Sequence, residues 1–190
     1  MLLLSGAAAA QGVRGERGDI RIESALQSTG RGGTVVAELV IRAPADAVFA
    51  AMSRCADALK YLPHLLHCRE WPGDEGSLLV EHEVDFGWYA PRIRYVFRAE
   101  LDPGRRISFR QVQGDFTVNE GVWELEPTEG GTRVRYRARV EAPSYIPGWL
   151  ARAALTREFP RMLSELRRLC EDRQRLTAQA NIFLTTPSLD

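Results

Sequence analysis

The 190-residue sequence carries 25 Lys and Arg against 25 Asp and Glu, so its formal net charge at pH 7 is zero. Hydrophobic residues make up 45% and charged residues 26% of the chain, which is the composition of a globular domain and excludes disordered and collagen-like proteins. Because dedicated nucleic-acid-binding domains carry a basic excess, the balanced charge predicts no nucleic-acid partner.

The amino-terminal segment differs from the rest of the chain. Leu2–Leu4 followed by Ala7–Ala10 is similar to the apolar core and small-residue cleavage site of a secretory signal peptide, although no basic residue precedes it. A disordered alanine-rich tail is the alternative interpretation. Residues 1–18 are therefore expected to be a signal-peptide remnant followed by a Gly/Arg-rich linker. A signal peptide predicts a periplasmic or otherwise exported protein, and its absence a cytoplasmic one.

Alternating apolar and polar residues predict most of the next 120 residues to be antiparallel sheet. Residues 20–26 and 34–41 flank a Gly-rich turn, which is typical of a β-hairpin, and two short helices are expected at 45–52 and 56–62. Six further strands are expected at 66–71, 78–86, 92–101, 106–112, 117–126 and 132–141. The alternation predicts a sheet with one solvated face and one covered face.

A long helix over residues 149–173 is expected to cover that face. Its apolar residues recur at three- and four-residue steps, at Leu155, Phe159, Met162, Leu166 and Leu169. Pro160 interrupts the helix, so we expect a kink there. Residues 176–190 are expected to be a disordered polar tail. The fold class is thus α+β over residues 19–175, a curved antiparallel sheet around a long C-terminal helix.

Local phrases between residues 34 and 172 resemble the START-like (SRPBCC) superfamily. The segment 41–49 resembles its strand-to-helix opening, and 61–63 the end of its second helix. Four later segments resemble its polyketide cyclase/dehydrase branch, which includes coenzyme Q-binding proteins: 103–109 (PGRRISF), 114–116 (GDF), 121–127 (GVWELEP) and 131–134 (GTRV). The sequence departs from the pattern at Arg54-Cys55, where relatives often have an Asp and an aromatic residue.

The resemblance implies a helix-grip fold with a cavity between the sheet and the long helix. Members carry lipids, quinones, steroids or polyketides in this cavity, a few cyclise polyketides, and others bind ribosomal partners. No single catalytic signature is shared by the family, so the resemblance assigns no catalytic residue. The candidate cavity-lining aromatic residues are Trp88, Tyr95, Phe97, Phe109, Trp123, Tyr136 and Trp149. The alternative is that these aromatic side chains simply form the core.

Three polar residues share the parity of the covered face. His82 alternates in phase with Leu78 and Val80, and Gln111 and Asn119 have the same inward parity on later strands. Buried polar groups need hydrogen-bond partners, so either they satisfy one another or a ligand satisfies them. His82 is compatible with three roles: a structural histidine, a hydrogen-bond donor to a ligand such as a quinone, or a general base.

Cys55 and Cys68 bracket the second short helix and are candidates for a disulfide in an oxidising compartment, with free thiols as the alternative. The spacing of His64, His67 and Cys68 is similar to that of metal ligands, but Pro63 breaks the helix immediately before them and no second cluster matches. We therefore expect no metal site.

An arginine ladder follows the outward parity of the last strand, at residues 133, 135, 137 and 139. It is compatible with binding phosphates or an anionic membrane. Cross-strand ion pairs are the default expectation, with outward-facing Glu81, Glu83, Glu100 and Glu124 as the candidate partners.

The sequence contains no Gly-rich phosphate loop, GxSxG elbow or HExxH motif, so no cofactor is expected. The predicted function is a carrier or sequestering protein for an apolar or amphipathic small molecule. The alternatives are a polyketide cyclase or dehydratase with His82 as general base, and a protein-interaction module acting through the arginine ladder. The expected partner is a hydrophobic small molecule, with transient membrane contact also compatible with the sequence and the oligomeric state open.

Overall fold

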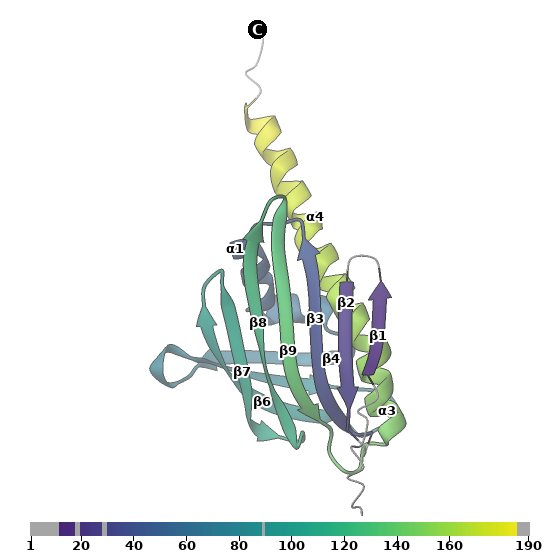
Figure 1. Ribbon diagram of the computed structural model, residues 1–190. Helices are drawn as coiled ribbons and strands as arrows, with labels where there is room; N and C mark the ends of the chain where they lie inside the picture. The colour runs from purple at the N-terminus through teal and green to yellow at the C-terminus, as the bar shows by residue number, and fades with distance from the viewer. Residues whose placement is uncertain (1–11, 18–19, 28–29, 89, 186–190) are drawn as a thin grey trace, which may run out of the picture.

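The computed structural model describes residues 12–17, 20–27, 30–88 and 90–185 (Figure 1). Its strands, in chain order, are β1 (Gly12–Arg17), β2 (Ile20–Leu26), β3 (Gly32–Ile41), β4 (Leu65–Pro72), β5 (Leu78–Val84), β6 (Ile93–Asp102), β7 (Arg106–Gly114), β8 (Val118–Thr128) and β9 (Gly131–Glu141). Its helices are α1 (Ala45–Met52), α2 (Cys55–Tyr61), the 3-10 turn η1 (Asp74–Gly76), α3 (Gly148–Ala153), the π-helical segment η2 (Ala154–Glu158) and α4 (Phe159–Thr185).

All strands join one antiparallel sheet in the order β1-β2-β3-β9-β8-β7-β6-β5-β4. The predicted hairpin is β2–β3, and β9 closes the meander by pairing with β3 from Gly32↔Glu141 to Ile41↔Thr132. The predicted alternation is confirmed on β9, where Val134 and Ala138 are buried and the arginine ladder faces outward. The sheet therefore has one covered and one solvated face.

Helix α4 lies against the covered face, and the sheet curves around it (Figure 1). Leu163 and Leu166 are fully buried and Met162 nearly so, while Leu155, Phe159 and Leu169 pack against the core at partial burial. Helices α1 and α2 contact α4 on the same side of the sheet. The predicted α+β helix-grip arrangement is confirmed.

We expect a kink at Pro160, and a π-helical segment, η2, ends two residues before this proline. Proline has no backbone N–H and crowds the carbonyl of the preceding turn. A π-helix widens the hydrogen-bond spacing to five residues and is a recognised way of inserting such a defect into a helix. The segments α3, η2 and α4 follow one another without a gap from Gly148 to Thr185.

Two terminal expectations were wrong. The segment expected to be a linker forms β1, which pairs with β2 from Gly12↔Ala25 to Arg17↔Ile20. Strand pairing uses backbone groups, so a Gly-rich segment can add to an edge despite its poor β-propensity. The expected disordered tail from Leu176 is helical to Thr185, because residues 176–185 contain neither glycine nor proline. The signal-like residues 1–11 lie outside the described part of the chain.

An ion pair between the buried Asp57 carboxylate and Arg173 connects α2 to α4. The Asp57 side chain is 4% exposed and accepts two hydrogen bonds from the Arg173 guanidinium and one from Lys60 Nζ at 3.3 Å. The hydrogen bonds from Arg173 outweigh burial and hold the pKa of the Asp57 carboxyl below its usual range.

Among the described helices, none has both the length and the apolar content needed to span a membrane.

Candidate functional site

A cavity of about 210 Å³ lies between the covered face of the sheet and the helices. The strands β4 to β9 contribute its floor, and α1, α2 and α4 contribute its roof. The floor consists of large rigid side chains on a curved sheet, and these leave space under the helices. Protein interiors are close-packed and rarely leave a void larger than one water molecule.

Five of the seven predicted aromatic residues line this cavity together: Tyr95, Phe97, Phe109, Trp123 and Tyr136. Their rings form a continuous series of contacts. Trp123 and Tyr136 are direct cross-strand partners with ring centroids 4.1 Å apart. Phe109 stacks on Tyr136 at 6.3 Å and meets Phe97 at 5.8 Å. Phe159 of α4 extends the series from above, at 5.0 Å from Tyr136.

Trp88 and Trp149 do not line the cavity, contrary to expectation. Trp88 follows the end of β5 and is 95% exposed, and Trp149 lies in the first turn of α3 and is 61% exposed. Only their residue type favours a place in the cavity, because neither tryptophan belongs to a strand whose alternation determines which face its side chain occupies. In α3 the neighbouring Leu150 is the buried residue.

The two inward amides have different positions. Asn119 lines the cavity as predicted. Gln111 does not, because its Nε2 donates to the carbonyl oxygen of Phe116 at 2.7 Å. Gln111 keeps its inward parity as the cross-strand partner of Phe97, and the register shift between β6 and β7 begins only after it. Gln111 therefore holds the loop between β7 and β8 rather than facing a ligand.

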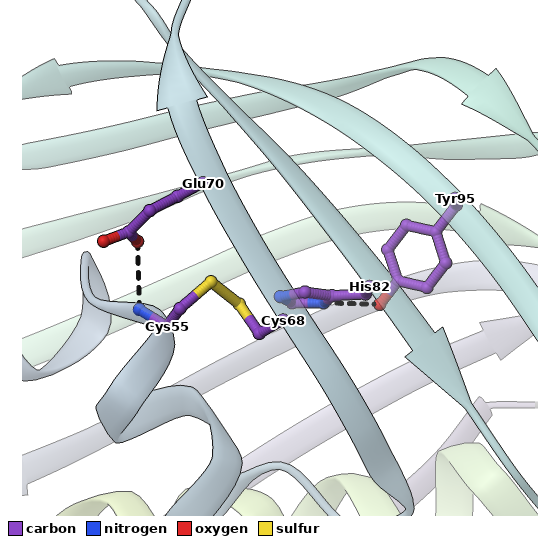
Figure 2. The surroundings of a disulfide bond; sticks show 5 residues. All are labelled: Cys55, Cys68, Glu70, His82 and Tyr95. Carbon is purple, nitrogen blue, oxygen red and sulfur yellow. Dashed lines mark hydrogen bonds between the residues drawn. A yellow bond between two sulfur atoms is a disulfide. The ribbon is translucent and has the colours of Figure 1, made fainter.

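His82 occupies the predicted inward position and is 6% exposed. It is the cross-strand partner of Tyr95, so the two side chains leave adjacent strands on the same face. Nδ1 of His82 lies 3.0 Å from Oη of Tyr95 (Figure 2). Burial lowers the pKa of His82 to about 4 and raises the pKa of Tyr95 above its usual value. Both groups are therefore uncharged at neutral pH.

A disulfide between Cys55 and Cys68 forms part of the cavity wall (Figure 2). It connects the first residue of α2 to the edge strand β4, with the two Cα atoms 5.2 Å apart. The backbone N–H of Cys55 also donates to Oε2 of Glu70 at 3.0 Å. The sequence predicts this pair as a candidate disulfide, whereas its place in the cavity wall depends on the tertiary structure.

The possible metal ligands are separated by this arrangement. The sulfur of Cys68 is in the disulfide, and Nε2 of His64 lies 3.5 Å from Glu158, with its ring 5.2 Å from that of Phe86. No cluster of three or more His, Cys, Asp or Glu side chains suited to a metal occurs within the described ranges.

Arg133, Arg135 and Arg137 of the arginine ladder form ion pairs on the outer face. Arg135 Nε lies 3.0 Å from Glu38, and Arg137 Nη2 lies 2.9 Å from Glu124, so the partners come from the flanking strands β3 and β8. Glu124 was among the predicted partners. Glu83, also predicted, instead pairs with Arg92 and Arg94 at 3.0 and 2.8 Å, because β5 is not adjacent to β9.

Comparison with known proteins agrees with this architecture. Residues 32–171 match the family described as polyketide cyclase/dehydrase and lipid transport. No match was found among curated protein sequences.

Solved structures share the fold at low sequence identity. The aromatase/cyclase Zhui from Streptomyces sp. R1128 is 18% identical, with a TM-score of 0.63 over 75% of this chain and 95% of that one. A STAR-related lipid transfer protein from Xanthomonas axonopodis is 16% identical, with a TM-score of 0.65 over 84% and 98%. Human STARD10 is 8% identical, with a TM-score of 0.71 over 92% and 78%. The chain belongs to the polyketide cyclase/dehydrase and lipid transport family and has the helix-grip fold of the START-like superfamily.

Proposed function

We propose that this protein binds an apolar or amphipathic small molecule in the cavity between the sheet and α4, as a carrier or sequestering protein. The observation that carries the proposal is the cavity itself, about 210 Å³ of space over an aromatic floor. A cavity of predominantly apolar lining with a few convergent polar groups is the usual form of a small-molecule site. The STAR-related lipid transfer protein among the structural relatives supports the same class of function.

The state of His82 argues for binding rather than proton abstraction. A general base works best when its pKa is near the operating pH. Burial lowers the pKa of His82 to about 4, so the imidazole is a weak base at neutral pH. It remains a good neutral hydrogen-bonding group. The cyclase alternative, with His82 as base, is therefore less favoured, although an aromatase/cyclase is among the structural relatives.

Binding is tested with the short-chain quinone coenzyme Q0 and two variants, one in the cavity and one on the outer face of the sheet. Trp123→Ala removes part of the cavity floor and is expected to weaken quinone binding about tenfold, since aromatic side chains dominate such contacts. Arg135→Ala, on the outer face, is expected to leave the affinity unchanged. Calorimetry measures both affinities, and quenching of Trp123 fluorescence reports occupancy in the wild type. Loss of binding on removing Arg135 but not Trp123 would contradict the proposal and favour the interaction-module alternative.

We also propose that the protein works in an oxidising compartment, the periplasm or another exported location. The Cys55–Cys68 disulfide supports this, because structural disulfides persist outside the reducing cytosol. Protein isolated from its own host is expected in the periplasmic fraction, with both cysteines protected from alkylation and a mature N-terminus near Gln11. Cell fractionation and N-terminal sequencing measure this. An intact Met1 on a cytoplasmic protein with free Cys55 and Cys68 thiols would overturn it.

A further inference from the structure

The His82–Tyr95 pair has two hydrogen-bond donors, and the hydrogen bond between the two side chains uses only one of them. A neutral imidazole carries one N–H and a phenol carries one O–H, so the uncharged pair has two donors. The contact between Nδ1 and Oη uses one of them. If the phenol donates to Nδ1, the free donor is Nε2–H of His82. If Nδ1–H donates to the phenol oxygen, the free donor is the hydroxyl of Tyr95. Either tautomer leaves a single donor.

That donor opens into the cavity. Both His82 and Tyr95 belong to the cavity lining. In the described part of the chain, the completely covered side-chain nitrogen and oxygen atoms without a hydrogen-bond partner belong to Arg98, Gln111 and Glu158. No atom of His82 or Tyr95 belongs to that set. The two side chains are hydrogen-bonded to each other. When Nε2–H of His82 is the free donor, it therefore faces cavity space rather than packed protein; when the Tyr95 hydroxyl is the free donor, it belongs to a residue of the cavity lining.

The immediate surroundings of the donor are largely aromatic and carry no charge. Edge contacts place the rings of Phe97 and Phe116 about the pair, at 5.1 Å from His82 and from Tyr95 respectively. The charged members of the lining, Arg54 and Glu70, are exposed residues beside the disulfide. In Figure 2 the Glu70 carboxylate accepts a hydrogen bond from the backbone N–H of Cys55, whereas the His82 ring is hydrogen-bonded to Tyr95. A charged group next to the pair would lose its hydration without gaining a counter-ion.

We propose that the cavity selects ligands that carry an uncharged hydrogen-bond acceptor, a carbonyl or ether oxygen on an otherwise apolar body, through the one spare hydrogen of the His82–Tyr95 pair. This inference rests on the proposed function and specifies its ligand class. It differs from a general preference for apolar molecules, because a hydrocarbon of the same shape leaves the donor unsatisfied. A carboxylate of the same shape pays the desolvation of a full charge for a single hydrogen bond.

Three matched probes test the inference: 2-acetylnaphthalene, its hydrocarbon counterpart 2-isopropylnaphthalene, and 2-naphthoate. Calorimetry on the full chain gives the ratio of acetyl to isopropyl affinity in the wild type and in the variants. The double variant His82→Phe/Tyr95→Phe has no donor at the position of the pair, and its affinity ratio is expected to fall about tenfold. Each single variant keeps one donor, so each is expected to retain most of the wild-type ratio. The carboxylate is expected to bind the wild type more weakly than the ketone.

Infrared spectroscopy gives a second measurement that does not depend on affinity. The carbonyl stretch of bound, carbon-13-labelled 2-acetylnaphthalene is expected at lower frequency in the wild type than in the double variant, because a hydrogen bond weakens the C=O bond. An unchanged affinity ratio and an unchanged stretch in the double variant would overturn the inference while leaving the cavity as a binding site. Failure of both neutral probes to bind the folded wild type would overturn the proposed function and the inference with it.

Discussion

Replacing Leu166 with Asp is expected to lower the free energy of unfolding by at least about 4 kcal/mol, a large part of the stability of an ordinary domain. Leu166 is fully buried where α4 meets the sheet. The change removes a large apolar side chain from a close-packed site and introduces a carboxylate without a partner. Urea denaturation measures the effect, and a variant that fails to fold at 25 °C satisfies the same expectation.

Leu176→Asp is the matched control on the same helix. Leu176 is 65% exposed, so the same substitution there is expected to change stability by less than about 1 kcal/mol. The comparison separates burial against the sheet from any general effect of aspartate on the helix. Equal melting temperatures for the wild type and Leu166→Asp would refute the arrangement of helix and sheet.

The second large effect is a pH dependence of stability caused by His82. Burial lowers its pKa in the folded protein to about 4, whereas an unfolded histidine titrates near its ordinary value of about 6.5. Between these values the unfolded state binds the proton and the folded state does not, so stability falls as the pH falls. The wild type is expected to lose about 3 kcal/mol more between about pH 7 and pH 4 than His82→Phe loses.

Urea denaturation of both proteins at the two pH values measures this difference. Val80→Ala, a buried change on the same strand and face, is the control. It is expected to lower stability equally at both pH values, because it removes packing without removing a titrating group. Equal acid losses in the wild type and His82→Phe would show that the folded protein accepts the proton, and the uncharged His82–Tyr95 pair would be wrong.

The sequence by itself determined the order of the strands of the meander, the two short helices, the long C-terminal helix and the inward direction of His82 and Asn119. These features follow from a local periodicity, since successive side chains of a strand face opposite sides and helix neighbours recur at three and four residues. Five aromatic positions of the cavity floor could be predicted for the same reason. Each lies inside a regular strand.

Only the tertiary structure decided what depends on contacts between distant segments. Trp88 and Trp149 lie beyond the ends of regular strands, so no periodicity fixed the direction of their side chains, and both are exposed. The amide of Gln111 donates to the backbone carbonyl of Phe116, a contact that depends on the course of the loop after β7 and keeps this residue out of the cavity lining. The Cys55–Cys68 bond and the contact of His82 with Tyr95 depend on which strands and helices become neighbours. A local pattern specifies which face a side chain occupies, whereas its partner across that face is set by packing of the whole chain.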